Sequence, residues 1–432
     1  MAVTMKEAGA GSDTAPDTSL TGSFLMAAAE MTQPEVVSSR LLRLPAALLV
    51  RIAGHAEDCS LPSMRLVSRR ITETTWKAYL EAFFITRAHL TTTYGLRVLA
   101  DVSRTEVFAR KIKSISLLDK IIYRYTLYLS DDTVRRGYTL QQHDIKQRVW
   151  AGSDATTLTQ IFSNLARLGL SPRVEIYPWR KRRHKIVHGE RQLDRKLGLD
   201  QDHIVFCDNQ CDRAIAQVLV AMAVSGFKAA ALDLCTFHRD AWVGGLAFNL
   251  PLDLFEAPNE PFRLLTSLGI GFGEALPTLA PGDLYAASRV FSSPHALEKL
   301  SAKGACAVNG SECREMQALM SMIQTTKLKS LGLFNISGTA LSFIDGLARS
   351  RATLRSLAIA LATIPTDNCW TPVLKFLAFV LSIDRVLVSG LYRSDRSRLL
   401  KGRTHRQAAA WRDVAGVKDW LIENEETVYD LV

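Results

Sequence analysis

Leu328-Lys-Ser-Leu331-Gly-Leu333 is the fullest copy of a pattern that returns along the C-terminal half of the chain. In a β-strand, residues two positions apart lie on the same face, so Leu331 and Leu333 would both point into a core. The first leucine would anchor the turn that leads into the strand. The pattern therefore predicts a short buried strand preceded by an apolar turn.

Other segments repeat this pattern with small changes. The clear copies begin 26 to 32 residues apart, which is close to the period of leucine-rich repeats. They are Leu265-Thr-Ser-Leu268-Gly-Ile270, Leu297-Glu-Lys-Leu300-Ser-Ala302, Leu354-Arg-Ser-Leu357-Ala-Ile359 and Ile383-Asp-Arg-Val386-Leu-Val388. Weaker copies are Ile112-Lys-Ser-Ile115-Ser-Leu117, Val174-Glu-Ile176 and Ala229-Ala-Ala-Leu232-Asp-Leu234. The body of the chain, residues 86–410, thus resembles an irregular leucine-rich-repeat protein.

Helical segments separate these predicted strands. We expect helices over Asp212–Ser225, Glu312–Gln324 and Ala340–Arg349, with Asp212 as an N-cap and Gly226 as a C-cap. The predicted fold class is α/β: a solenoid with parallel strands on one face and helices on the outer face. A doubly wound α/β domain also alternates strands with helices and remains the alternative.

A different pattern lies near the N-terminus. Leu44-Pro45-Ala-Ala-Leu48-Leu49-Val-Arg-Ile52 is followed, after a short interval, by Leu61-Pro-Ser-Met64-Arg65-Leu66-Val67-Ser68-Arg69. The two segments resemble a fungal-type F-box, a small helical module, which we place at residues 41–85. Three positions depart from the family pattern, because Ala47 replaces an acidic residue, Ala56 a larger apolar residue and Ser60 an aspartate.

The resemblance implies a function without covalent chemistry. F-box proteins dock on a Skp-type adaptor, and through it on a cullin, and they recruit a target protein to a ubiquitin ligase of the SCF type. The chain would then be a receptor and not an enzyme, with no cofactor and with a target that the sequence does not identify. By this resemblance the adaptor-binding residues would be Leu44, Pro45, Leu48, Leu49, Ile52, Leu61, Leu66 and Val67. A repeat scaffold without a ligase role and an enzyme with an α/β body are the alternatives.

Composition limits the class of protein. The chain has 432 residues, 47% of them hydrophobic, which suffices for a large core. We expect residues 1–40 to be disordered and residues 411–432 to form a capping helix, with Trp411 and Trp420, and an acidic tail. No apolar run is long enough for a membrane span. The seven cysteines, an odd number, favour free thiols in the nucleus or cytoplasm.

The formal net charge of +10 is unevenly distributed. A dense cluster consists of Arg180, Lys181, Arg182, Arg183 and Lys185, within a basic loop expected near residues 180–196. A second basic stretch runs over residues 393–406. The cluster is interpreted as a nuclear-import signal or as an ordinary solvated loop. Nucleic acid is not an expected partner, because no interleaved aromatic residues or zinc-finger spacing accompany the charge.

Few residues indicate other chemistry. Cys207, Cys211, Cys235 and His238 could form a zinc ligand set, but buried free cysteines are the simpler interpretation. His143 and Asp144 are adjacent, yet no nucleophile motif accompanies them. No metal site and no catalytic residue are therefore predicted. Trp150, Trp179, Trp242 and Trp370 are either core residues or binding hot spots.

Overall fold

The computed structural model describes residues 43–55, 60–120, 132–178, 187–198, 211–235, 250, 252–255, 261–271, 296–304, 319, 327–336, 338–364, 370–389, 391–393 and 415. The chain divides into two compact units, Met1–Tyr79 and Leu80–Val432. The predicted disordered tail and the basic cluster from Arg180 to Lys185 lie outside the described residues. So do the predicted helix over 312–324 and the segment 411–432, except for one residue of each.

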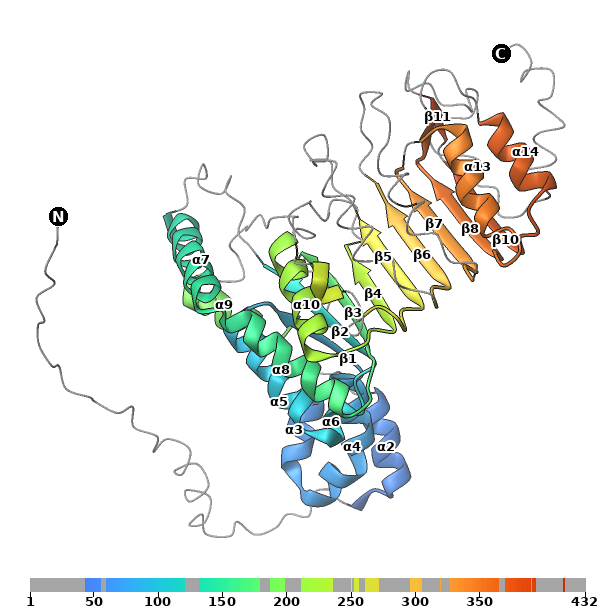
Figure 1. Cartoon of the computed structure of the whole chain (residues 1–432). Coiled ribbons are helices and arrows are strands. Elements are labelled where there is room, and N and C mark those ends of the chain that lie inside the picture. Colours follow the sequence, from blue (N-terminus) through green and yellow to red (C-terminus); the bar gives the residue numbers. More distant parts are fainter. Residues whose placement is uncertain are drawn as a thin grey trace, which may run out of the picture. The chain divides into compact units, whose positions relative to one another are not determined.

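All regular secondary structure in the described part of the first unit is helical (Figure 1). Its helices are α2 (Ala46–His55), α3 (Ser60–Val67) and the first part of α4 (Arg69–Phe84). Its buried residues include Leu49, Ala53, Leu61, Ile71 and Thr75. The buried hydroxyl of Thr75 donates a hydrogen bond to the carbonyl of Ile71, four residues earlier (2.7 Å), and so remains satisfied.

Arg65 joins α3 to α4. Its guanidinium group lies 4.6 Å from the ring centroid of Trp76 and 4.0 Å from that of Tyr79. Such contacts between a cation and an aromatic face are attractive. The hydroxyl of Ser68, between the two helices, accepts a hydrogen bond from the backbone N–H of Ile71 (3.2 Å) and caps α4. These contacts fix the C-terminal end of α3 against α4.

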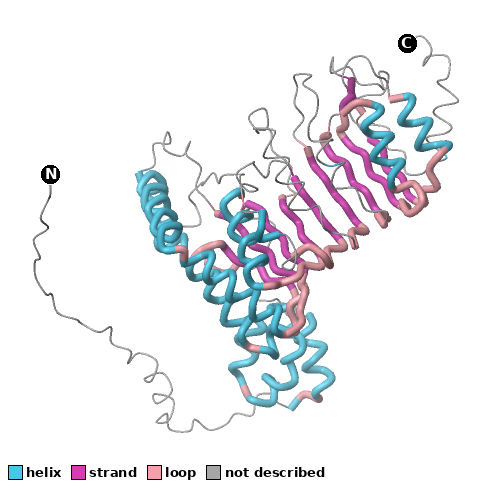
Figure 2. The backbone as a smooth tube through the Cα atoms, viewed as in Figure 1, coloured by secondary structure: helices cyan, strands magenta, loops and turns pink. Residues whose placement is uncertain are grey.

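The second unit contains a parallel sheet of nine strands (Figure 2). Its strands, in spatial order, are β1 (Thr86–Leu90), β2 (Ser114–Asp119), β3 (Arg173–Pro178), β4 (Ala231–Leu234), β5 (Ser267–Gly271), β6 (Lys299–Lys303), β7 (Ser330–Phe334), β8 (Ser356–Ala360) and β10 (Arg385–Ser389). The short strands β9 (Thr363–Ile364) and β11 (Tyr392–Arg393) form a separate parallel pair. The spatial order follows the chain order, whereas a doubly wound sheet reverses its order at a switch point. The doubly wound alternative is therefore wrong.

The repeated leucines form a continuous core. In β7 the leading Leu328 and the inward-facing Leu331 and Leu333 are at most 2% exposed. Leu331 is in register with Leu300 of β6 and with Leu357 of β8. Every copy of the pattern, clear or weak, coincides with a strand of the sheet. The same pair of apolar side chains is therefore stacked from one strand to the next, and each repeat buries its core against its neighbours.

Helices pack beside the strands of the second unit. They are α5 (Thr93–Arg104), α6 (Glu106–Ala109), α7 (Asp132–Ala151), α8 (Ser153–Arg167), α9 (Glu190–Leu197), α10 (Asp212–Ser225), α13 (Ala340–Arg349), α14 (Thr371–Phe379) and the 3₁₀ helix η5 (Leu252–Phe255). Helices α5, α8 and α10 lie side by side over the first strands, and α13 lies beside α14 (Figure 1). The helices predicted over Asp212–Ser225 and Ala340–Arg349 are confirmed.

Three local predictions need correction. Asp212 is the first residue of α10 and Cys211 is its N-cap, whereas Gly226 is the predicted C-cap, with φ of 69°. Residues 190–197, expected to belong to a loop, form α9, because Leu193 and Leu197 bury one face of this segment. Strand β1 was not predicted, since the buried polar side chains of Arg87 and His89 interrupt its apolar pattern.

Candidate functional sites: an exposed apolar set and a buried ionic network

The first candidate site consists of exposed apolar side chains on α2 and α3. Leu66 is 89% exposed, Val67 51%, Val50 49%, Leu48 45% and Ile52 40%. We call these five residues the exposed apolar set. The described part of the chain exposes seventeen large apolar side chains, and five of them lie in these two short helices. Sequence reasoning named four of the five and missed Val50.

The other predicted adaptor-binding residues have different positions. Leu49 and Leu61 are buried, at 0% and 2% exposure, and belong to the core of the helical unit. The carbonyl of Pro45 accepts the first backbone hydrogen bonds of α2. The carbonyl of Leu44 accepts a hydrogen bond from the Arg70 guanidinium (2.8 Å), which ties the start of α2 to α4. These four residues shape the helical unit, and the exposed apolar set remains accessible on it.

An exposed apolar set favours association with a partner. Single apolar side chains on a surface are ordinary, but a dense group of them marks an interaction surface. Burying one leucine side chain completely contributes about 1.5–3 kcal/mol. Leu66 and Leu48 alone could therefore provide several kilocalories per mole to a complex that covered both of them.

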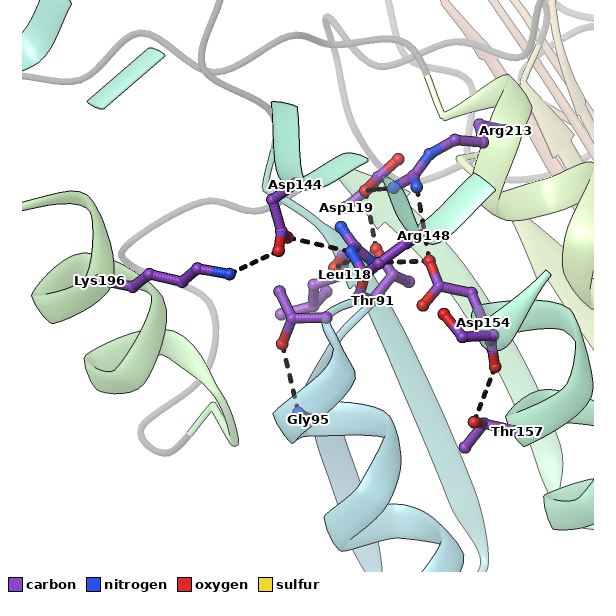
Figure 3. A network of polar contacts seen from close by, with 12 residues as sticks. Thr91, Gly95, Leu118, Asp119, Asp144, Arg148, Asp154, Thr157, Lys196 and Arg213 are labelled. Atoms are coloured by element: carbon purple, nitrogen blue, oxygen red, sulfur yellow. Dashed lines mark hydrogen bonds and ion pairs between the residues drawn. The ribbon is translucent and has the colours of Figure 1, made fainter. Parts of the chain in front are cut away.

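The second candidate site is a buried ionic network at the C-terminal ends of β1 and β2 (Figure 3). Arg148, in the last turn of α7, is only 7% exposed. Its Nη1 atom donates to Asp154 Oδ2 (2.5 Å) and to the carbonyl oxygen of Thr91 (2.8 Å). Its Nε atom donates to Asp144 Oδ2 (3.0 Å). Asp154 lies in the first turn of α8, where the helix dipole also favours a negative charge.

Asp119 and Arg213 extend the network on the other side. Asp119 ends β2, is 3% exposed and accepts hydrogen bonds at Oδ1 from the Thr91 hydroxyl (2.7 Å) and from Arg213 Nη2 (3.2 Å). Arg213 Nη1 also lies 3.5 Å from Asp154 Oδ2. Asp119 Oδ2 has no hydrogen-bond partner among the described residues. A cavity of about 10 Å³ lies beside it, which is room for one water molecule at most.

Asp144 links the network to α9. Burial would raise the pKa of the Asp144 carboxyl group, but the hydrogen bond from Lys196 and the charge of Arg148 outweigh it and lower the pKa. Nearby, Lys120 Nζ donates to Asp194 Oδ1 on α9 (2.6 Å). The network therefore holds α7, α8, α9 and α10 against the ends of β1 and β2. These contacts join separate elements of the fold, so we assign the network a structural role.

The structure also places the other candidate residues. Cys211 and Cys235 are buried free thiols, and burial together with the hydrogen bond to Cys235 raises the pKa of Cys211. Cys207 and His238, the other two residues of the possible zinc set, lie outside the described residues. Within the described ranges, no group of three or more acidic, cysteine or histidine side chains could hold a metal ion.

The tryptophans differ in exposure. Trp150 is 90% exposed at the end of α7, so it could contact a partner. Trp370 is 1% exposed and packs against Phe343, with ring centroids 5.1 Å apart, so it is a core residue. Trp179 and Trp242 lie outside the described residues, as do Trp411 and Trp420.

No family model matches the sequence, and no curated protein is significantly similar to it. None of the helices in the described ranges combines the length and the apolar character that crossing a bilayer requires.

Proposed function

We propose that this chain is the substrate-recruiting receptor of an SCF-type cullin ubiquitin ligase. One observation carries the proposal: the apolar residues of the F-box-like motif divide into two groups. Leu49 and Leu61 are buried in the helical unit, whereas Leu48, Ile52 and Leu66 are exposed on it. A docking module needs this division, because some apolar residues must hold the fold while others remain available to the adaptor.

The second unit supports the proposal as the part that holds the target. Its strand order and stacked leucines are compatible with a leucine-rich-repeat solenoid. In this proposal a target bound on the repeats is held in the same complex as the ubiquitin-loading enzyme. The chain then contributes by raising the effective concentration of the target, and none of its residues forms a covalent bond.

Co-purification with a Skp-type adaptor tests the proposal. The full chain would be co-expressed with the adaptor beside a double variant, Leu48→Asp with Leu66→Asp. Both side chains are exposed, so the variant should fold, whereas a charge placed at the buried Leu49 would unfold the unit. The matched control is Leu140→Asp with Val224→Asp, because these side chains are 46% and 58% exposed in the second unit.

We expect the wild-type chain and the control to bind the adaptor. The double variant should lose several kilocalories per mole of binding free energy, because two apolar contacts are replaced by desolvated charges. Circular dichroism would verify that all variants are folded. A wild-type chain that does not bind the adaptor would contradict the proposal and leave the repeat scaffold without a ligase role. An equal loss in the control would also contradict it.

A further inference from the structure

A second surface, on the repeat unit, is strongly basic. Exposed basic side chains lie at the N-terminal ends of strands β6, β7, β8 and β10, which form one edge of the sheet. We call this group the basic row; it consists of Lys299, Lys327, Lys329, Arg351, Arg355 and Arg385. Backbone hydrogen bonds show that Lys329, Arg355 and Arg385 are neighbours, because the N–H of Arg355 donates to the carbonyl of Lys329 (2.8 Å) and the N–H of Arg385 donates to the carbonyl of Arg355 (3.1 Å).

Few acidic groups compensate this charge. Residues 296–299, 327–330, 350–356 and 381–385 form the edge and contain six basic residues but only two acidic ones, Glu298 and Asp384. Glu298 Oε1 lies 2.8 Å from Lys329 Nζ, and the Lys329 side chain is more exposed than that of Glu298. The hydrogen bond from Lys329 and the charges of Lys329, Lys299 and Lys327 lower the pKa of the Glu298 carboxyl group. An anion at this edge is therefore stabilised by several cations at once.

The dimensions of the basic row fit a short extended peptide. Neighbouring strands are about 4.8 Å apart, so the four strands span roughly 15 Å. An extended chain rises about 3.3 Å per residue, and about five residues cover that distance. The four edge ranges contain no aromatic residue. Proteins that bind single-stranded nucleic acid stack its bases on aromatic side chains, so this edge is better suited to a peptide.

We propose that the basic row binds an extended segment of the target protein that is rich in Asp and Glu. This inference rests on the proposed function, since it states the chemistry by which a target would be recognised. Exposed ion pairs are individually weak and are screened by salt, so the contact is strong only when several acidic side chains bind together. It therefore selects acidic segments and steers them to the repeat unit.

Fluorescence anisotropy of labelled probes on the full chain tests this assignment. The probes are a Glu-rich peptide, the same peptide with Gln in place of Glu, and an oligothymidylate. The first variant reverses three charges of the basic row: Lys299→Glu, Lys329→Glu and Arg355→Glu. The matched control reverses three exposed charges on α7 and α9: Arg136→Glu, Lys146→Glu and Arg191→Glu.

We expect the Glu-rich peptide to bind the wild-type chain and the control, and the Kd to increase at least tenfold in the basic-row variant. Binding should also weaken as the salt concentration rises, and the Gln peptide should not bind. The inference is overturned by no binding of the Glu-rich peptide, by equal losses in both variants, or by tighter binding of the oligothymidylate to the basic row. Adaptor co-purification of the same variants separates this test from that of the proposed function, since it should be unchanged.

Discussion

The parallel sheet has one edge where its strands end and another where they begin, and these two edges use charge in opposite ways. At the C-terminal ends of β1 and β2, Arg148 and Arg213 are surrounded by carboxylates that hydrogen-bond to them. At the N-terminal ends of β6 to β10, Lys329 and Arg355 are exposed among other basic residues. The first edge pairs its cations with buried carboxylates, while the second keeps six basic side chains exposed with only two acidic residues among them.

The difference shows that the burial of a charge, more than its sign, indicates its role. A buried cation must find its carboxylate within the fold, because removing one partner leaves an uncompensated charge in a poorly polarisable environment. An exposed cation is solvated and contributes little to stability. Substitutions at the buried network should therefore affect folding, and substitutions at the basic row should affect binding.

The largest effect is expected for Arg148→Met. This substitution leaves Asp154, which is 2% exposed, without its closest cation, and it removes a hydrogen bond to Asp144. Breaking a buried pair in this way costs about 3–5 kcal/mol in the free energy of unfolding. Urea denaturation would measure it beside Lys146→Met, an exposed substitution on the same helix that should cost almost nothing. A loss below about 1 kcal/mol at Arg148 would remove the distinction between the two edges.

The parallel sheet could be predicted from the sequence because its cause is local. Two leucines at a spacing of two, with a third leading into the strand, are enough to define a buried strand. Each strand that carries this pattern was found in place. β1 has no such pattern, because the polar residues Arg87 and His89 occupy buried positions in it, and His89 meets its partner His188 only in the folded chain.

The candidate sites could be predicted only in part, for the same reason. The motif identified the leucines of α2 and α3, but only the structure separates buried Leu49 from exposed Leu48. The ionic network joins Thr91, Asp119 and Arg213, which are far apart in the sequence and meet only when the strands are in register. A carboxylate directly after a predicted strand, as in Asp119, was the one available signal.

As the pH falls, the region around β1 should lose stability before the ionic network does. The rings of His89 and His188 stack, with centroids 4.8 Å apart. Burial, then the charges of Arg87 and His188, lower the pKa of His89, and burial and Arg87 lower that of His188 to about 4. Below about pH 6.5 the unfolded chain therefore binds more protons, and stability falls as the pH decreases towards 4, by up to about 1.4 kcal/mol per pH unit for each histidine.

Urea midpoints at neutral and mildly acidic pH would test this dependence. His188→Gln should flatten the pH profile, since it removes one of the two titrating groups. Asp144 serves as the contrast: its pKa is lowered in the folded chain, so its contribution to stability is present above the ordinary pKa of a carboxyl group and is lost only as the pH falls through that pKa, below the range in which the histidines begin to titrate. An unchanged profile in His188→Gln would assign the acid sensitivity to other groups.

A smaller effect is expected where α5 packs against β1. A Cβ atom on Gly95 would lie 2.3 Å from the carbonyl oxygen of Leu90 and 2.9 Å from that of His188. Gly95→Ala should therefore destabilise the chain by about 1–3 kcal/mol, although alanine is the better helix former. Gly54→Ala in α2 is the matched control, because its Cβ atom would meet nothing within 4 Å and the change should stabilise α2. Thermal denaturation would compare the two, and a stabilised Gly95→Ala would show that this contact relaxes freely.

The smallest effect on stability is expected at the basic row. Lys329→Met removes one exposed ion pair with Glu298, and exposed ion pairs contribute little to stability. The pKa of Glu298 should rise towards its ordinary value, because its hydrogen-bond donor is lost. Urea denaturation and NMR titration of Glu298 would measure both quantities. A loss of stability as large as that of Arg148→Met would mean that the row supports the fold and is not free to bind a partner. A negligible loss, combined with weaker binding of the Glu-rich peptide, would assign the charge of this edge to recognition.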